Sequence, residues 1–488
     1  MAIQSKQQPG PVTASTDVLD MPLDFLGQAH FLHIYTQLCL CYSVANPALH
    51  PAILSTLRKG LERLSWGFPW IAGQVVKEGA NGESTGVYKL KSFEKVVSLN
   101  VKDLSNDRSF PSMDALRKAN FPMKMLGESI LAPRRTIPGF PDEAGLKNTP
   151  ALLVQATFLA GGLLLTVASH HAAMDMTGQG HLMSLLSKAC HGESFAAQEL
   201  MIGNLSRHNL IPFLDDTYQP GPEASILHFK AQPDPKPTST PSSPIEAEVD
   251  VNKEKLNQAP PPCSWAHFTF RPSSLQALKF IATATKPSSA RFISTDDALC
   301  ALIWQAISRA RLARLPPMTE STLGRAVDLR PHIDTIPNTY LGLTQNMVMS
   351  NLTLDSITTS TLGAISANLR STLARGTSNI LYDTSALATV ITRAANKTEA
   401  FAHEFLDYTK DIAISSWKEV NCSKLDFNLG LGFPEALRRP SFTPLEGVIF
   451  FLPKALDGEV GVAICLNDED MARLKGDGKF MKYATFVG

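Results

Sequence analysis

Residues 231–262 form the proline-rich stretch that most constrains how this chain can fold. Apart from its prolines the stretch is mostly polar, so it cannot bury enough apolar surface to fold by itself. It therefore predicts a crossover linker between two folded halves, and the length of 488 residues agrees, because one hydrophobic core rarely serves so long a chain. We expect an N-terminal half over residues 19–230 and a C-terminal half over residues 263–488. The prolines are Pro233, Pro235, Pro237, Pro241, Pro244, Pro260, Pro261 and Pro262.

Apolar patterning on either side of this linker predicts a mixed α/β fold with hairpins. Residues 152–159 and 163–169 are apolar and partly β-branched, and the glycines between them permit the positive φ angles of a tight turn. Strands and helices do not alternate regularly, so repeating βα units are not expected. Further strands are expected at residues 31–38, 264–270, 325–330, 412–417, 448–452 and 461–466. Helices are expected at residues 47–64, 272–283, 352–376 and 384–406, and another opens at Thr295.

Charge and cysteine content argue against several classes of partner. Lysine and arginine total 45, as do aspartate and glutamate, so the zero net charge indicates no nucleic-acid partner and no anionic membrane surface. The seven cysteines lack metal-ligand spacing, so we expect no metal site, no disulfide and a reducing, cytoplasmic location. Residues 1–18 are expected to be disordered and lack the apolar core of a signal peptide, and no run of about 20 apolar residues predicts a membrane span.

Two histidines and an aspartate lie where the hairpin ends and a helix is expected to begin. In Ser169-His170-His171-Ala172-Ala173-Met174-Asp175, a strand would place His170 and His171 on opposite faces. We expect His171 to face a cleft as a general base, because it has the four-residue spacing to Asp175 and an unperturbed histidine pKa is about 6.5. We expect His170 to pack or to cap. The alternative for His171 is a buried histidine that is hydrogen-bonded to a backbone carbonyl.

Several motifs, taken in chain order, resemble those of a known family. His171 to Asp175 and the loop Asp426-Phe427-Asn428-Leu429-Gly430 resemble the His-x-x-x-Asp and Asp-Phe-Gly-Trp-Gly motifs of the BAHD-type coenzyme A-dependent acyltransferases, with departures at Asn428 and Leu429. The continuation through Arg438-Arg439-Pro440 is more similar to the fungal trichothecene 3-O-acetyltransferase branch. Other segments similar to that branch lie at residues 69–75, 185–190, 294–299, 325–328, 345–347, 415–417 and 468–471.

The resemblance implies a fold, a reaction and roles for several residues. The fold would consist of two similar mixed-sheet α/β domains, chloramphenicol acetyltransferase-like, with an active-site channel between them. His171 would take the proton of an acceptor hydroxyl while acetyl-CoA, a co-substrate and not a permanently bound cofactor, is held in a ternary complex. Asp175 would be structural and would pair with Arg330. Asp426 and Gly430 would belong to a structural loop on the coenzyme side.

Contacts with coenzyme A are expected from two groups of residues. One group follows from the resemblance and consists of Thr295, Ser416 and Trp417. The other group follows from residue type and could either bind the coenzyme phosphates, which suit guanidinium forks, or form a solvated helix end favoured by the helix dipole. This second group consists of Arg309, Arg311 and Arg314.

The expected acceptor is a small hydroxylated natural product, namely a polycyclic secondary metabolite such as a trichothecene-like terpenoid or an ergot-type alkaloid. We expect the enzyme to be a monomer. Two alternatives stay open. One is a condensation-domain-like enzyme that uses carrier-bound thioesters, since such domains carry His-His-x-x-x-Asp-Gly, although Met176 follows Asp175 here. The other is a non-catalytic relative that retains the fold and binds a ligand.

Overall fold

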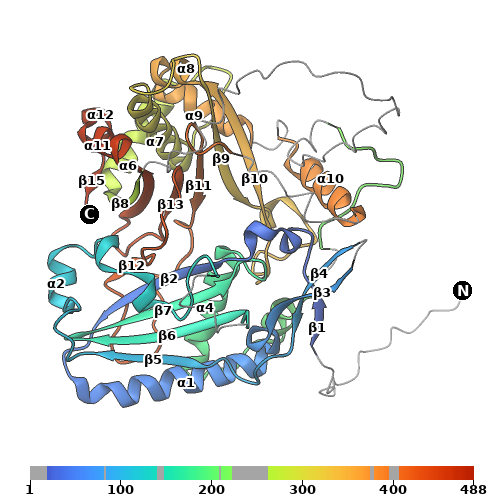
Figure 1. Ribbon diagram of the computed structural model, residues 1–488, viewed down its shortest axis with the longest axis vertical. Coiled ribbons are helices and arrows are strands. Elements are labelled where there is room, and N and C mark those ends of the chain that lie inside the picture. Colours follow the sequence, from blue (N-terminus) through green and yellow to red (C-terminus); the bar gives the residue numbers. More distant parts are fainter. Residues whose placement is uncertain are drawn as a thin grey trace, which may run out of the picture.

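The computed structural model describes residues 19–81, 84–139, 148–207, 210–221, 262–373, 378–394 and 406–488. The disorder predicted for residues 1–18 and the linker predicted at residues 231–262 therefore lie outside the described residues, except for Pro262. Figure 1 shows two halves, one above the other, each built around its own β-sheet. The predicted α/β architecture with two mixed-sheet halves is confirmed.

A five-stranded sheet forms the centre of the lower half, in the order β12-β2-β7-β6-β5. The predicted hairpin is present: β6 and β7 pair antiparallel through Gly161, whose φ of +79° only glycine adopts readily. β2 pairs antiparallel with β7, with Tyr35 opposite His170. The strands are β2 (Tyr35–Ser43), β5 (Leu99–Leu104), β6 (Leu152–Leu159), β7 (Gly162–His170) and β12 (Ala436–Arg438).

Two long helices, α1 (His50–Gly67) and α4 (Met176–Cys190), pack against each other on one face of this sheet. In α1 the buried residues recur at helical spacing, as expected of an amphipathic helix: Ile53, Leu57, Leu61 and Leu64. A smaller antiparallel sheet, β1-β4-β3, lies at the side of the lower half in Figure 1. The remaining elements of this half are β1 (Asp20–Pro22), β3 (Gln74–Ala80), β4 (Thr85–Lys91), α2 (Met113–Lys118), α3 (Glu128–Leu131) and α5 (Ala197–Gly203).

A seven-stranded mixed sheet forms the upper half, in the order β10-β9-β11-β13-β14-β8-β15. One face of this sheet and the helices above it share a second hydrophobic core. The strands are β8 (Cys263–Phe270), β9 (Glu320–Asp328), β10 (Gln345–Thr353), β11 (Ile412–Ser416), β13 (Val448–Phe451), β14 (Val460–Asn467) and β15 (Thr485–Phe486). The helices are α6 (Pro272–Ala284), α7 (Thr295–Arg311), α8 (Leu354–Thr359), α9 (Leu362–Ser371), α11 (Asp468–Gly476) and α12 (Gly478–Met481).

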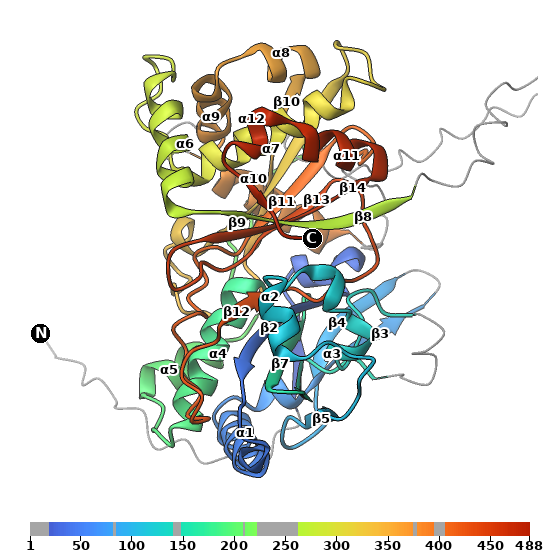
Figure 2. The same ribbon diagram turned by 90° about the vertical axis from the view of Figure 1, so that its left-hand side faces the viewer.

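The two halves exchange chain segments, so residues 263–488 do not all belong to the upper half. Figure 2 shows the chain after β11 descending along α4 before it reaches β12, which joins the edge of the lower sheet beside β2. Helix α10 (Ile380–Arg393) and residues 329–343 also contribute buried side chains to the core of the lower half. A boundary drawn only from the linker cannot find these returns, because each is held to the lower half by partners far away in the sequence.

Two local predictions were wrong. Residues 345–353 form β10, whose last two residues were predicted to be helical. The rest of the segment predicted to be mostly helical forms two short helices, α8 and α9, and its residues 374–376 lie outside the described residues. β10 has no alternation of buried and exposed residues and owes its conformation to pairing along its whole length with β9. Residues 30–32, partly predicted as strand, form the 3₁₀ helix η2 (His30–Leu32), and β2 begins only at Tyr35.

Candidate active site

His171 lies directly after β7, in the turn that leads into α4. Its backbone N–H donates to the carbonyl of Ile34 at 2.8 Å, which fixes the turn to the start of β2. The neighbouring His170 ends the strand and is only 1% exposed, packed edge-on against the rings of His33 and Tyr35. The prediction that His170 packs is therefore confirmed, and the change of direction after it leaves His171 only partly buried.

The hydrogen bonds of the His171 ring define which nitrogen can accept a proton. Nδ1 lies 3.3 Å from the carbonyl oxygen of Met174, an acceptor, so the proton belongs on Nδ1. Nε2 is then the accepting nitrogen, and the amide Nε2 of Gln345 donates to it at 3.4 Å. Since Gln345 is the first residue of β10, the basic nitrogen faces the upper half from a turn in the lower half.

Burial lowers the pKa of His171, and the nearby Arg439 guanidinium acts in the same direction. The Asp175 carboxylate and the Met174 carbonyl act in the opposite direction. A lowered pKa means that the imidazole is neutral at neutral pH, which is the state that a general base requires. The arrangement thus satisfies both requirements, an accepting nitrogen and a neutral ring.

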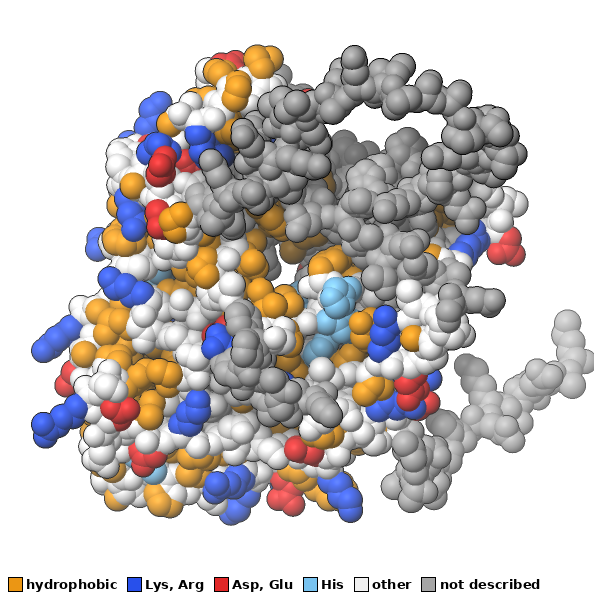
Figure 3. Space-filling model, in the orientation of Figure 1, with side chains coloured by type: hydrophobic (Ala, Val, Ile, Leu, Met, Phe, Trp, Pro, Cys, Tyr) orange, Lys and Arg blue, Asp and Glu red, His pale blue; other side chains and the backbone are white. Residues whose placement is uncertain are grey.

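The space-filling view shows an opening between the two halves, bordered by hydrophobic side chains with histidine side chains beside it (Figure 3). His171 lies at this junction of the halves, as its contact with Gln345 shows. The ring itself is only partly buried. The general-base interpretation depends on this placement.

Asp175 does not face the same way as the histidine ring. It is 3% exposed and caps α4 by accepting the N–H of Gly178 at 2.8 Å. Its two oxygens also accept from Arg330, with Nη1–Oδ2 3.0 Å and Nη2–Oδ1 3.1 Å, and Oδ2 accepts the N–H of Thr344 at 2.7 Å. The predicted Asp175–Arg330 pair is therefore present. Every contact of this carboxylate stabilises the turn and the junction with the upper half.

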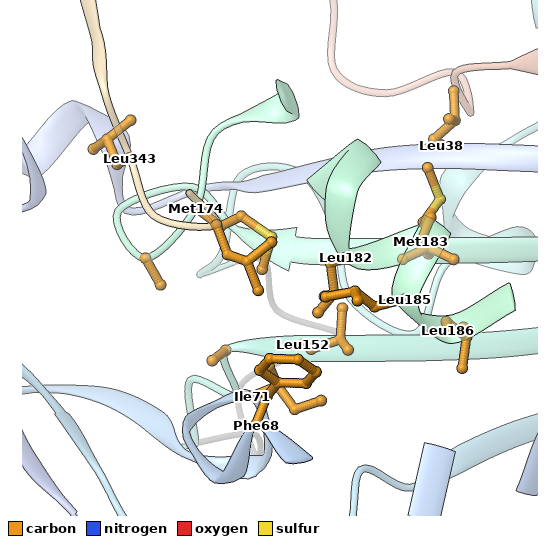
Figure 4. Close-up of a cluster of buried hydrophobic side chains, with 14 of the residues drawn as sticks. Leu38, Phe68, Ile71, Leu152, Met174, Leu182, Met183, Leu185, Leu186 and Leu343 are labelled. Carbon is orange, nitrogen blue, oxygen red and sulfur yellow. The ribbon is translucent and has the colours of Figure 1, made fainter. Parts of the chain in front are cut away.

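Apolar packing anchors the turn from below. Figure 4 shows Met174 directed into a buried cluster together with Leu182 of α4 and Leu343 of the segment before β10. On the far side, the guanidinium Nε of Arg207 donates to the carbonyl of Ala173 at 3.2 Å while the group stacks 3.8 Å from the Trp70 ring. Side chains on both sides of the backbone therefore hold the His171 loop rigid, as a preorganised site needs.

The Asp426 loop contacts the opposite end of α4. The carbonyl of Asp426 accepts from Ser187 and, at 3.1 Å, from Nε2 of His191, while its carboxylate accepts the N–H of Asn428 at 2.8 Å. Asn428 and Gly430 both have left-handed φ angles, +54° and +73°. Because α4 has 15 residues, this loop lies about 20 Å from His171. The contacts are of the kind that a structural loop makes.

Leu429, at the position where the family motif has tryptophan, is buried in the core of the lower half. Trp417 does not replace that side chain. It is buried in a separate cluster with Met176 and Leu452, next to the His171 turn. Of the predicted coenzyme residues, Thr295 begins α7, and Ser416 at the end of β11 donates to the next residue of that helix, Asp296, at 3.1 Å.

The arginines at the C-terminal end of α7 and just beyond it pair with groups inside the protein, which argues against phosphate ligands, although Arg314 is exposed as at a solvated helix end. Arg309 pairs with Asp477 at 2.7 Å, and Arg314 pairs with Asp470 at 2.8 Å. Arg311 is buried and donates to the carbonyls of Tyr408 and Asp411. The three guanidinium groups join α7 to α11, α12 and the chain before β11, and each has at least one partner inside the protein.

Two residues of the site were not predicted as such. Gln345 was noted only within a similar segment, and Arg439 only within the Arg438-Arg439-Pro440 motif. Neither carries a local signal, since each acts through a partner far away in sequence. Among the described residues, no group of three or more His, Cys, Asp or Glu side chains could hold a metal ion. In the same part of the chain no helix has the length and apolar character needed to cross a bilayer.

Comparison with known proteins identifies relatives over nearly the full length. Residues 34–190 match the trichothecene 3-O-acetyltransferase-like N-terminal domain, and residues 139–481 match the Transferase family. The chain is 44% identical over 473 residues to O-acetyltransferase dmxR13 of Cryptosporiopsis sp. (strain 8999), covering 96% of this chain and 98% of the relative. It is 42% identical over 477 residues to trichothecene 3-O-acetyltransferase TRI101 of Fusarium sporotrichioides, covering 98% and 99%. F. graminearum TRI101 complexed with coenzyme A and T-2 mycotoxin has a TM-score of 0.86 and 40% identity, covering 96% of this chain and 100% of that chain.

Proposed function

Since this chain belongs to the Transferase family and carries its trichothecene 3-O-acetyltransferase-like N-terminal domain, we propose that His171 is the general base of an acetyl transfer from acetyl-CoA to a hydroxyl group. The chain is an acyl-CoA-dependent O-acyltransferase, as its full-length relatives are O-acetyltransferases. The observation that supports the assignment of the base is the geometry of one ring. Nδ1 of His171 is held by the Met174 carbonyl, and Nε2 is left to accept a proton at the junction of the halves.

The reaction is a single displacement within a ternary complex. Nε2 of His171 takes the hydroxyl proton as the alcohol oxygen attacks the thioester carbonyl, and a tetrahedral oxyanion forms. The carbon–sulfur bond then breaks, the acetyl ester is released, and the proton passes from the imidazolium to the coenzyme thiolate. Base catalysis contributes about 10²–10⁴-fold, and alignment of the two substrates contributes a comparable factor or more. No acyl-enzyme forms on this path.

Asp175 takes no part in proton transfer in this proposal. Its oxygens are occupied by Arg330, Thr344 and the α4 N-terminus, so it is a structural residue that positions the His171 turn. Asp426 and Gly430 likewise order the loop against the far end of α4. Contacts with coenzyme A are assigned to the start of α7 and the end of β11, through Thr295, Ser416 and Trp417.

The acceptor belongs to the class of polycyclic, hydroxylated secondary metabolites, either a trichothecene-like terpenoid or an ergot-type alkaloid. Support comes from the relative that was crystallised with coenzyme A and T-2 mycotoxin at 40% identity over almost the whole chain. We assign the enzyme to the cytoplasm as a monomer. All seven cysteines are free, including the closely spaced Cys39 and Cys41, which suits a reducing compartment.

The experiment that tests this function is acetyl-CoA turnover by the purified protein against a panel of hydroxylated polycyclic metabolites. Thiol release and the mass of the product are read together. We expect an acetylated product from at least one trichothecene-like alcohol, with one thiol released per ester formed. Transfer only from a carrier-bound thioester would instead support the condensation-type alternative. Coenzyme binding without thiol release on any acceptor would support a non-catalytic relative.

A further inference from the structure

Arg439 is a buried cation with few hydrogen-bond partners. It follows β12, is 2% exposed, and among the described residues has one hydrogen bond, from Nη2 to the hydroxyl of Thr136 at 3.4 Å. Its Nε and Nη1 have no acceptor among the described residues. Buried arginines are normally paired with a carboxylate or with carbonyls, since an uncompensated charge is costly in a low dielectric. An unpaired one next to a reaction centre calls for a functional explanation.

Three aromatic rings stabilise this cation without neutralising it. The guanidinium carbon lies 4.3 Å from the ring of Phe442, 4.4 Å from that of Phe450 and 5.3 Å from that of Trp417. Such ring faces favour a cation through their quadrupole, yet they carry no net charge. Burial lowers the pKa of Arg439 to about 9, so the group still carries its charge at neutral pH. The positive charge therefore remains available to act on its surroundings.

The carboxylate whose charge acts on Arg439 is Glu128, and it is hydrogen-bonded to other groups. Its Oε2 accepts the N–H of Thr136 at 2.7 Å and the amide of Gln37 at 3.3 Å. Burial raises the pKa of Glu128, which weakens it further as a counter-charge. Thr136 thus stands between the two groups, and no ion pair joins Arg439 to a carboxylate within the described part of the chain.

Arg439 and His171 are held to the same short piece of backbone. The carbonyl of Thr136 accepts the N–H of Tyr35 at 2.9 Å, and the carbonyl of the preceding Ile34 accepts the N–H of His171 at 2.8 Å. β12 runs antiparallel to β2, with Arg438 opposite Cys39, so the chain after it heads toward Tyr35 and the His171 turn. Figure 1 shows β12 at the edge of the lower sheet, facing the upper half.

Other charged or titratable groups near His171 cannot take this role. His170 is buried and neutral, because burial holds its pKa well below the usual range. The Asp175 carboxylate raises the pKa of His171, and it forms an ion pair with Arg330. Gln345, which contacts Nε2, is uncharged. Arg439 is therefore the cation that acts on the ring from the β12 side.

We propose that Arg439 is a positioning residue for His171, whose unpaired charge adds to burial in favouring the neutral imidazole that accepts the hydroxyl proton. The effect of this role on catalysis rests on the proposed function, whereas the effect on the pKa of His171 can be measured without it.

The test is a titration of the histidine ring signals by NMR in the free protein, without either substrate. The protein is labelled at histidine, and the His171 signal is identified by its loss in His171→Gln. Arg439→Met removes the charge and leaves an adaptable apolar side chain. Arg439→Gln is the second variant, which keeps an N–H donor for Thr136 and is used if the methionine variant does not fold.

Arg438→Met is the matched control, since it also removes an arginine next to β2, a partly buried one that donates to the carbonyls of Asn120 and Phe121. We expect the pKa of His171 to rise by about half a unit or more in the Arg439 variants and to stay in place in Arg438→Met. The acid limb of kcat/KM should move to higher pH by the same amount. An unmoved His171 pKa in both Arg439 variants, or an equal rise in Arg438→Met, would overturn the proposal. Because the titration needs no turnover, it tests the role of Arg439 separately from the acyl-transfer function.

Discussion

Asp175 and Arg330, which are 155 residues apart, form a two-point ion pair that ties the turn carrying His171 to the upper half. Both side chains are almost completely buried, and Thr344 adds a main-chain donor to the same carboxylate. Arg330 is held in turn by the carbonyls of Tyr340 and Gly342. The aspartate of the motif thus fixes where the histidine stands relative to the opposite wall of the junction.

Asp175→Asn should destabilise the protein by about 3–5 kcal/mol, because it leaves the buried Arg330 without its main counter-charge. Thermal or denaturant unfolding measures this, and activity should fall with it as the turn loses its anchor. The control is Asp328→Asn, which removes the other carboxylate on Arg330, one that is a third exposed. Its effect should be about 1 kcal/mol or less. Equal losses in the two variants would contradict the structural role of Asp175.

Gly430→Ala should cost about 1 kcal/mol of unfolding free energy, because the left-handed φ of +73° is unfavourable for any residue with a Cβ. Crowding is not the cause, since an added Cβ would have no neighbour within 4 Å. Gly476→Ala is the matched control, at an equally open position that ends α11 without a left-handed φ. It should be neutral or slightly stabilising. If both variants behave alike in denaturant unfolding, the conformation assigned to the Asp426 loop is wrong.

His267→Leu should reduce the acid sensitivity of the fold. His267 is 1% exposed, and burial holds its pKa well below 6.5, so the folded protein keeps it neutral while the unfolded chain binds a proton. Protonation of this histidine in the unfolded chain therefore costs no stability above pH 6.5. Below that pH it lowers the free energy of unfolding, by about 2 kcal/mol at pH 5. Unfolding free energies at pH 7 and pH 5 measure the difference. Parallel losses in the parent and the variant would contradict it.

The sequence allowed correct prediction of features that rest on local pattern or on motif spacing. The hairpin that ends at His170 followed from two apolar runs and a glycine pair, and the Asp175–Arg330 pair followed from a family resemblance. The two mixed-sheet halves also followed from the family resemblance. Each of these signals lies within about ten residues or is carried by a recognisable motif.

Long-range partnerships could not be predicted in the same way. β10 is a strand because it pairs with β9, and β12 leaves its own half to pair with β2. The arginine cluster at the C-terminal end of α7 has the composition of a phosphate site, yet each of its members already has a partner inside the protein. Only the fold shows whether a guanidinium is paired, as these are, or unpaired, as Arg439 largely is.

The most direct test of the central claim compares His171→Gln with the parent enzyme in acetyl transfer at saturating acetyl-CoA. We expect the rate of ester formation to fall by about 10²–10⁴-fold, because the base is lost while the substrates can still bind. The melting temperature should change little, since the ring is only partly buried and contributes little to the core. A His171→Gln enzyme that transfers acetyl groups near the parental rate would contradict the account.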